Sequence, residues 1–96
     1  LAFGELRVDL GACAVEVAGA PVPLTPTEYE ICELLARHPG QVFTRTQIRE
    51  RVLGWESGAD DSAVSMHVSR ARRKLAEAGA DPIATVWGMG YRWQSR

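Results

Sequence analysis

Two threonines define where helices can begin in this chain. Thr25 stands three positions before Glu28 and is followed directly by proline, and Thr44 stands three positions before Gln47. In such a capping box the threonine hydroxyl accepts a hydrogen bond from the backbone N–H three residues later, and the Glu or Gln side chain accepts one from the threonine N–H. Proline has no backbone N–H. It suits the first helical position because an N–H there would have no partner within the helix. The spacing therefore predicts one helix that begins after Thr25 and another that begins after Thr44.

Ahead of the first capping box the pattern is typical of strands. Apolar residues alternate with other residues in short bursts that glycines separate. The alternating positions are Leu6, Val8, Leu10, Cys13, Val15, Val17, Val22 and Leu24. A period of two broken by glycine indicates a small antiparallel sheet. Because proline cannot donate to the hydrogen-bond ladder, Pro21 and Pro23 restrict the last strand to an edge.

The first two helices differ in length and in their apolar faces. The first has a broad apolar face, which predicts a central position, and residues 38–40 end it. That face consists of Tyr29, Ile31, Cys32, Leu34 and Leu35. The second helix is short, with Gly54 near its end. Its inward stripe consists of Ile48, Val52 and Trp55.

A third helix carries the candidate functional residues. Either Asp60 or Asp61 can cap it, and Gly79 ends it. At about 100° per residue, one side is an apolar stripe of Val64, Val68, Ala71, Leu75 and Ala78. The opposite side consists of Ser62, Met66, Ser69, Arg70 and Arg73, with Ser65 and Arg72 on one flank and His67 and Lys74 on the other. No acidic residue lies between Asp61 and Glu77, whereas four permanent cations do.

Charge is unevenly distributed along the chain. The net charge of −1 and the pI of about 6.1 argue at first against a nucleic-acid partner. Residues 1–36 carry one basic and six acidic residues, a net charge of −5, whereas residues 37–96 carry ten basic and six acidic residues, a net charge of +4. A partner responds to the local field more than to the sum. The basic part can therefore attract a polyanion.

The last segment, residues 83–94, is rich in β-branched and aromatic residues around two glycines, which predicts a β-hairpin. Two helices joined by a short loop suit a helix-turn-helix, and a hairpin directly after them suits a wing. The predicted fold class is α+β, a winged helix-turn-helix in a single domain over residues 1–96. It has an N-terminal antiparallel β-sheet (1–24), a three-helix core (25–79) and a C-terminal β-hairpin wing.

The outward side of the third helix indicates DNA as the partner. A major groove about 12 Å wide admits one helix, arginines can bind guanine edges or phosphates, and Met66 can touch a thymine methyl. Serines allow close approach. A merely solvated basic face is the alternative, and the preceding helices and the following hairpin argue against it.

Several stretches also resemble the effector domain of OmpR/PhoB-type response regulators. They are residues 24–30, 39–45 and 64–68, then Arg70, Arg72 and Leu75, and finally Thr85, Val86, Gly88, Gly90, Tyr91 and Arg92. The match runs in order over nearly the whole chain, and its motifs are specific when taken together. The resemblance implies a four-stranded N-terminal sheet, a third helix that reads the major groove and a wing that touches the adjacent minor groove.

The resemblance also implies roles and partners. Residues at family positions that meet phosphates or bases are His67, Arg70, Arg72, Arg73, Thr85 and Tyr91. The implied partners are double-stranded DNA, bound as tandem direct repeats, and an N-terminal receiver domain phosphorylated on aspartate. The loop over residues 55–60 corresponds to the family's loop that can contact RNA polymerase. A regulator of the same type without a phosphorylated receiver is a further possibility.

Three positions depart from the family. Ser62 and Ser69 stand where arginine is frequent, and Trp87 stands where arginine is very frequent, so this chain offers fewer phosphate clamps and weak binding is expected of the isolated domain. Trp87 has three possible settings: along DNA sugars, across the hairpin against Tyr91 or Trp93, or against a neighbouring protein.

Other functions find less support in the sequence. Neither His38 nor His67 has a Ser or Cys nucleophile pattern around it, and two adjacent aspartates before a helix indicate a cap rather than a metal site. We therefore expect no enzyme activity, no metal and no cofactor. The rival of a different class is a winged helix used purely for protein contact, with Trp87 and Met89 as its hot spots.

The cysteines and the hydropathy bear on where the protein works. Cys13 and Cys32 stand apart, with no metal-binding spacing, and are expected to be small buried apolar residues, with a disulfide bridge between them as the alternative. The sequence contains no apolar run of membrane-spanning length. The expected location is a reducing cytoplasm, with no membrane partner.

Overall fold

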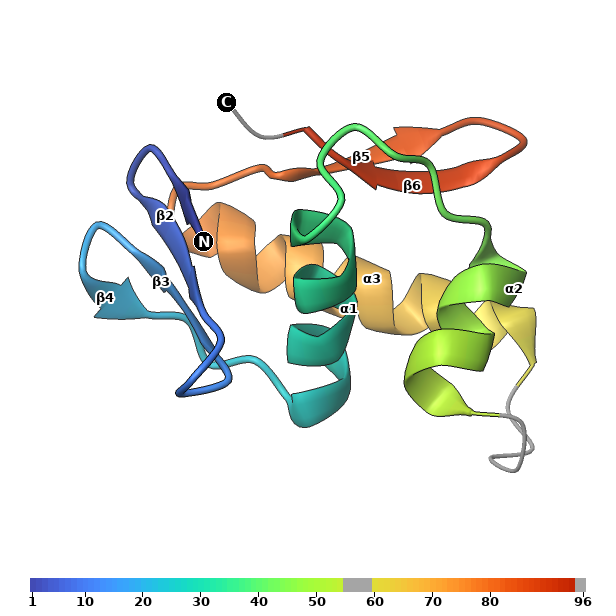
Figure 1. Ribbon diagram of the computed structural model, residues 1–96, viewed down its shortest axis with the longest axis horizontal. Helices are drawn as coiled ribbons and strands as arrows, with labels where there is room; N and C mark the ends of the chain where they lie inside the picture. The colour runs from blue at the N-terminus through green and yellow to red at the C-terminus, as the bar shows by residue number, and fades with distance from the viewer. Residues whose placement is uncertain (55–59, 95–96) are drawn as a thin grey trace.

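The computed structural model of the protein describes residues 1–54 and 60–94. In this part of the chain the elements are β1 (Ala2–Phe3), β2 (Leu6–Asp9), β3 (Ala14–Val17), β4 (Ala20–Pro21), α1 (Pro26–Ala36), α2 (Arg45–Ile48), a π-helical turn η1 (Arg49–Leu53), α3 (Asp61–Glu77), β5 (Ile83–Val86) and β6 (Gly90–Trp93). Figure 1 shows the sheet at one end, α1 in front of α3, and the β5–β6 hairpin along one edge. The predicted α+β order of sheet, helices and hairpin is confirmed.

Strands β1 to β4 pair antiparallel in chain order, which gives a four-stranded sheet in the described residues. The register of β2 and β3 pairs Leu6 with Val17 and Val8 with Val15, and all four side chains are buried. These four positions form the apolar face of the sheet that the alternating sequence pattern predicted. Pro21 lies in β4 at the edge of the sheet, as predicted, where its missing N–H breaks no inner ladder.

The two cysteines have different environments. Cys32 is fully buried in α1, as expected, and burial raises the pKa of its thiol to about 12. Cys13 is exposed, so the expectation that it is buried is wrong. Its φ of 52° places it in the turn between β2 and β3, outside the alternating strands. Both thiols are free.

Both predicted capping boxes form. The Glu28 N–H donates to Thr25 Oγ1 over 3.2 Å, and the Thr25 N–H donates to Glu28 Oε1 over 3.0 Å. At the second box the Gln47 N–H donates to Thr44 Oγ1 over 3.0 Å, and the Thr44 N–H donates to Gln47 Oε1 over 2.8 Å. The helices begin directly after each threonine, as the spacing predicted.

The second helix departs from a regular α-helix after one turn. It continues as η1, where the Gly54 N–H donates to the Arg49 carbonyl over 2.9 Å. Ile48 is fully buried and Val52 packs partly buried against the core, whereas Trp55, the third residue of the predicted stripe, lies outside the described residues.

Helix α3 is capped by Asp60 rather than Asp61. Val64, Val68, Ala71 and Leu75 are buried as predicted. Ala78 is exposed, so its place in the apolar stripe is wrong: the helix ends at Glu77, and Ala78 is the C-cap before Gly79 turns the chain with a φ of 95°.

The hairpin of β5, β6 and their turn, here called the wing, is fixed to the core at its base. The Phe43 N–H donates to the Tyr91 carbonyl over 2.8 Å, and the Tyr91 N–H donates to the Phe43 carbonyl over 3.0 Å. Gly90 has a φ of 150°, and a Cβ at this position would collide with the Phe43 carbonyl. Trp93 is buried against Phe3, with ring centroids 5.3 Å apart. The wing and the core therefore form one packed unit, from which the turn over residues 87–89 projects.

Candidate nucleic-acid interface

The outward side of α3 presents cations and small polar residues to solvent. The five residues predicted for this side are all exposed: Ser62, Met66, Ser69, Arg70 and Arg73. Among the described residues no carboxylate lies within 4.0 Å of Arg70 or Arg73. These two guanidinium groups are therefore available to an anionic partner. The remaining α3 candidates (Ser65, His67, Arg72 and Lys74) are half-buried on the flanks, as predicted.

One flank of α3 faces the wing. Arg72 Nη1 donates to Thr85 Oγ1 over 2.7 Å, and the Tyr91 hydroxyl lies 3.4 Å from Ser65 Oγ. Thr85 and Tyr91 are cross-strand partners, which explains why both reach the same side of the hairpin. The fold thus brings together four of the residues that the sequence predicted.

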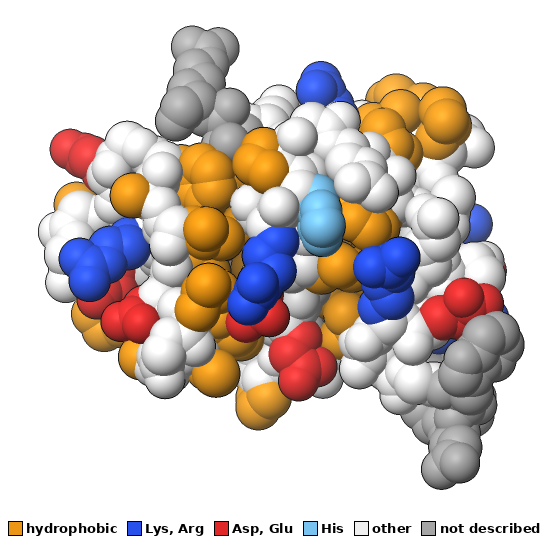
Figure 2. All heavy atoms as spheres, viewed as in Figure 1, with side chains coloured by type: hydrophobic (Ala, Val, Ile, Leu, Met, Phe, Trp, Pro, Cys, Tyr) orange, Lys and Arg blue, Asp and Glu red, His pale blue; other side chains and the backbone are white. Residues whose placement is uncertain are grey.

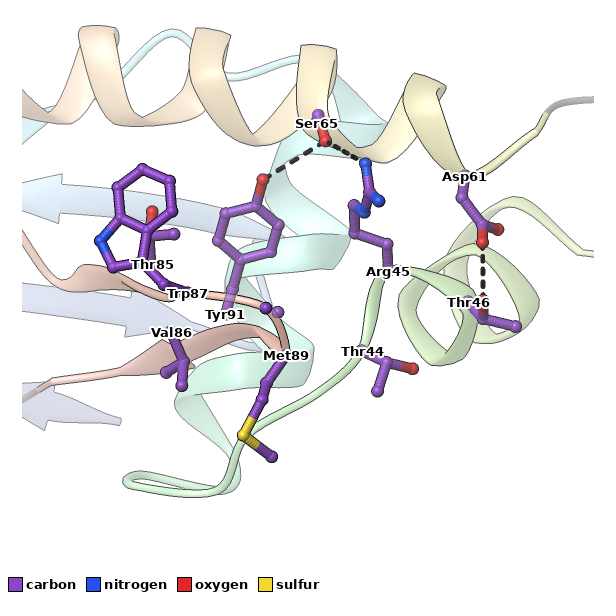
Figure 3. Close-up of a pocket in the computed structure, with 12 residues that line it drawn as sticks. Thr44, Arg45, Thr46, Asp61, Ser65, Thr85, Val86, Trp87, Met89 and Tyr91 are labelled. Carbon is purple, nitrogen blue, oxygen red and sulfur yellow. Dashed lines mark hydrogen bonds between the residues drawn. The ribbon is translucent and has the colours of Figure 1, made fainter.

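A cleft opens between the N-terminal half of α3, the start of α2 and the wing (Figure 3). We call it the wing cleft; the residues that matter here are Thr44, Arg45, Ser65, Thr85, Trp87 and Tyr91. The side chains of Arg45 and Tyr91 converge on Ser65, with Arg45 Nη1 3.5 Å from its Oγ (Figure 3). Long contacts of this kind leave donor capacity for a ligand oxygen.

Arg45 is a site residue that the sequence reasoning missed. It contributes a full cation to the wing cleft from the first position of α2. A signal for it was present, because a cation in the first turn of a helix is unfavourable beside the positive end of the helix dipole. Such a residue suggests a role other than stabilising the helix.

The acidic residue at the start of α3 is neutralised from α2 and η1. Thr46 Oγ1 donates to Asp61 Oδ2 and Arg49 Nε donates to Asp61 Oδ1, both over 2.7 Å. The hydrogen bonds from Thr46 and Arg49 lower the pKa of Asp61. They also tie α2 to α3, so Asp61 does not confront an anion with an unpaired charge.

Ser62 is committed to the helix cap. Its backbone N–H donates to Asp60 Oδ1 over 3.0 Å, and its hydroxyl donates to the same oxygen over 2.5 Å. The side chain is exposed, but its proton is already used. Ser62 can therefore allow close approach to a ligand without acting as a free donor.

The other flank of α3 is turned to α1. Lys74 Nζ donates to Glu28 Oε1 over 2.7 Å, and Glu28 is only 1% exposed. Burial alone would raise the pKa of Glu28, but hydrogen bonds from Lys74 and from the Thr25 N–H outweigh it and hold the pKa below its usual value. The charge of Lys74 is therefore balanced by Glu28. Unlike Arg70 and Arg73, it is not available to an anionic partner.

The wing turn places an indole in solvent. Trp87 is 89% exposed, whereas Trp93 is buried at the base of the wing. Packing of Trp87 across the hairpin against Tyr91 or Trp93 is thus wrong, because an indole packed in that way would lose much of its exposed area. In Figure 3, Trp87 points to the α3 side of the wing and Met89 to the opposite side.

The face formed by the sheet and α1 has a different character. In Figure 2 positive and negative side chains lie close together on it, and hydrophobic side chains gather between them. Arg37, for example, pairs with Glu33 over 3.4 Å. This face offers no extended field of one sign.

Two structural features are absent from the described residues. In residues 1–54 and 60–94 no helix combines the length and apolar character needed to cross a membrane. The same residues contain no group of three or more His, Cys, Asp or Glu side chains placed to hold a metal ion.

These features define a class of protein. Helix α2 packs against α3, α3 exposes a basic side, and a hairpin flanks that helix, which is the arrangement of a winged helix-turn-helix domain. Residues 19–93 match the family described as "Transcriptional regulatory protein, C terminal". The chain belongs to this family, the OmpR/PhoB-type effector domains of response regulators, as the sequence resemblance predicted.

Named relatives agree with this membership. Over 71 residues the chain is 48% identical to the transcriptional regulatory protein SpaR of Bacillus subtilis, covering 74% of this chain and 32% of SpaR. Over 92 residues it is 42% identical to the transcriptional regulatory protein CseB of Streptomyces coelicolor, covering 96% of this chain and 38% of CseB. The chain thus spans about a third of the length of one of these curated relatives and under two-fifths of the other.

A solved structure shows the same fold. The DNA-binding domain of the response regulator AdeR, solved in complex with an intercistronic region, superposes with a TM-score of 0.86 at 30% identity. The match covers 99% of this chain and 98% of that one. The sheet, the helices and the wing all lie within this match, so the predicted winged-helix fold is confirmed.

Proposed function

We propose that this domain binds double-stranded DNA in a sequence-specific manner, as the output domain of a response regulator. Helix α3 lies in the major groove and the wing lies at the adjacent minor groove. The observation that carries the proposal is the outward side of α3, where Arg70 and Arg73 are exposed with small side chains around them and no carboxylate among the described residues pairs with them. AdeR, a relative with the same fold, is described in complex with DNA from an intercistronic region.

The residues divide between two tasks. Arg70 and Arg73, with Met66 and Ser69 beside them, face the base edges and phosphates of the major groove. The donors of the wing cleft, with Arg72 next to them through its hydrogen bond to Thr85, hold a phosphate of the flanking backbone; the cleft donors are Arg45, Ser65, Thr85 and Tyr91. Phosphate contacts of this kind fix the register of a helix, and base contacts give the specificity. His67 and Lys74 lie on the flank turned to α1 and contribute less.

The full-length protein has further expected partners. A receiver domain precedes this domain and is phosphorylated on aspartate, and two output domains bind tandem direct repeats in the cytoplasm. The loop over residues 55–60 contacts RNA polymerase; residues 55–59 of that loop lie outside the described residues. We infer that the domain acts by binding alone, without catalysis, and needs no metal or cofactor.

A binding titration tests the proposal. A duplex is first selected from a random-sequence pool by this domain, and anisotropy is then measured at several salt concentrations for wild type and for Arg70→Ala/Arg73→Ala. Each phosphate-directed charge accounts for about 0.9 of the slope of log K against log salt. The double variant should therefore bind more weakly and should flatten the slope by about two.

The matched control removes the same number of cations elsewhere. Arg7 in β2 and Arg37 at the end of α1 are exposed and lie outside α3 and the wing. Arg7→Ala/Arg37→Ala should leave the slope close to that of wild type. The proposal fails if the two double variants lose affinity equally, or if no duplex is selected.

A further inference from the structure

Most of the large hydrophobic side chains exposed in the described residues lie on α3 and the wing turn, the elements proposed to bind DNA. In the described residues the exposed ones are Leu1, Met66, Trp87 and Met89, with Trp87 by far the most exposed at 89%. Met66 lies on the outward side of α3, and the last two lie in the wing turn. An indole this exposed contributes nothing to the core, so its area is available to a partner.

The hairpin alternation sets the direction of Trp87. Thr85 and Tyr91 face α3, where Arg72 and Ser65 contact them. Trp87 is the first residue after β5, which ends at Val86, and it continues the alternation of sides along that strand. Figure 3 shows Trp87 on the α3 side, at the edge of the wing cleft. The indole is therefore continuous with the proposed DNA surface.

The wing carries one charged residue, Arg92 in β6, and it lies opposite Ala84 on the side of the hairpin turned away from Thr85 and Tyr91. Between Asp81 and Arg92 the sequence contains no charged residue. The wing turn and the side of the wing that faces α3 therefore cannot use the attraction between a cation and the potential of a narrow minor groove. The means of contact available on that side are the indole and the polar groups of the wing cleft.

The walls of a minor groove can accept an indole. The groove is about 6 Å wide, and its walls are deoxyribose rings that present C–H groups. A planar aromatic ring can enter such a groove edge-on, and each Å² of apolar surface removed from water contributes about 25 cal/mol. A neutral contact displaces no condensed counterions, so its contribution does not depend on salt.

We propose that Trp87 is an apolar minor-groove contact, with its indole against the deoxyribose walls beside the major groove that α3 occupies. This rests on the proposed DNA-binding function and adds a consequence. The wing supplies affinity that does not vary with salt, while α3 and Arg45 supply the part that does.

Two variants of Trp87 test the inference on the selected duplex, shortened until it holds one domain. Trp87→Ala should weaken binding about tenfold, which is about 1.4 kcal/mol, at every salt concentration and with the slope unchanged. Trp87→Arg should restore affinity at low salt and steepen the slope by about one, because it adds one phosphate-directed charge. Met89→Ala is the matched control from the opposite side of the same turn, and it should stay within about twofold of wild type.

Three results would overturn the inference. They are a Trp87→Ala variant that binds the single-domain duplex as tightly as wild type, a Trp87→Arg variant with an unchanged salt slope, or a loss seen only on a longer duplex that holds two domains. The last result would assign the indole to a second protein. The same assay also measures Arg70→Ala/Arg73→Ala. If this double variant binds more weakly than wild type while the Trp87 variants do not behave as expected, the proposed DNA binding stands and only the role of Trp87 is wrong.

Discussion

Two threonines determine where α1 and α2 begin, and one glycine determines how closely the wing approaches the core. Thr25 and Thr44 each satisfy an N–H that the first turn of a helix leaves without a partner. Gly90 allows the wing backbone to approach Phe43 so closely that no side chain fits between them. Each of these effects follows from the geometry of a single residue.

The two capping threonines should each contribute to stability. Thr25→Ala and Thr44→Ala should each lower the free energy of unfolding by about 0.5–2 kcal/mol, because each leaves an N–H of the first turn unsatisfied. Urea denaturation followed by circular dichroism measures this. Thr27→Ala is the control, since Thr27 lies inside the same first turn and caps nothing. Urea unfolding curves that coincide for all three variants and wild type would contradict the capping roles.

Between elements, the ion pair of Glu28 and Lys74 connects α1 to α3. It joins residues 46 positions apart and leaves Glu28 nearly inaccessible to solvent. The pair holds α3 against the central helix, and α3 in turn is tied to α2 and η1 through Asp61. The orientation of α3 therefore depends on polar contacts at both of its neighbours as well as on its apolar stripe.

Removing one member of this pair should cost more than removing both charges. Lys74→Met leaves a buried carboxylate without its partner and should lower the free energy of unfolding by about 3 kcal/mol. Glu28→Gln/Lys74→Met should recover part of this loss, because glutamine can keep the capping box without a charge. Both are measured by urea denaturation. A Lys74→Met variant as stable as wild type, or a double variant less stable than the single one, would contradict the role of the pair.

Local sequence patterns were enough to predict the helices and strands. Most of the features that these patterns missed depend on contacts between residues far apart in the sequence. Capping boxes and apolar periods lie within one helix or strand, so α1, the start of α2 and the buried stripe of α3 could be predicted from the sequence. The commitment of Lys74 to Glu28 could not, because it depends on how two helices pack. Arg45 meets Ser65 across 20 positions for the same reason. Cys13 was wrongly expected to be buried because the strand alternation is interrupted by a turn at this residue. Ala78 was wrongly placed in the apolar stripe because α3 ends one residue before it.

Across the whole molecule the charges sort onto different faces. The face of α1 and the sheet mixes both signs (Figure 2), whereas α3 presents Arg70 and Arg73 without nearby carboxylates in the described residues. The net charge of −1 therefore says little about partners, since α3 can meet a polyanion directly. The backbone hydrogen bonds between Phe43 and Tyr91 also hold the wing against the core, so the wing turn keeps its position beside α3.

Methylation protection on the selected duplex tests most directly whether α3 occupies the major groove with the wing beside it. Dimethyl sulfate modifies guanine at N7, which faces the major groove, and adenine at N3, which faces the minor groove. With the domain bound, guanine N7 should be protected within one stretch of major groove, and adenine N3 should be protected in the minor groove directly next to it. Guanines that stay as reactive as in free DNA, while the domain is shown to be bound, would contradict the placement of α3 in the major groove.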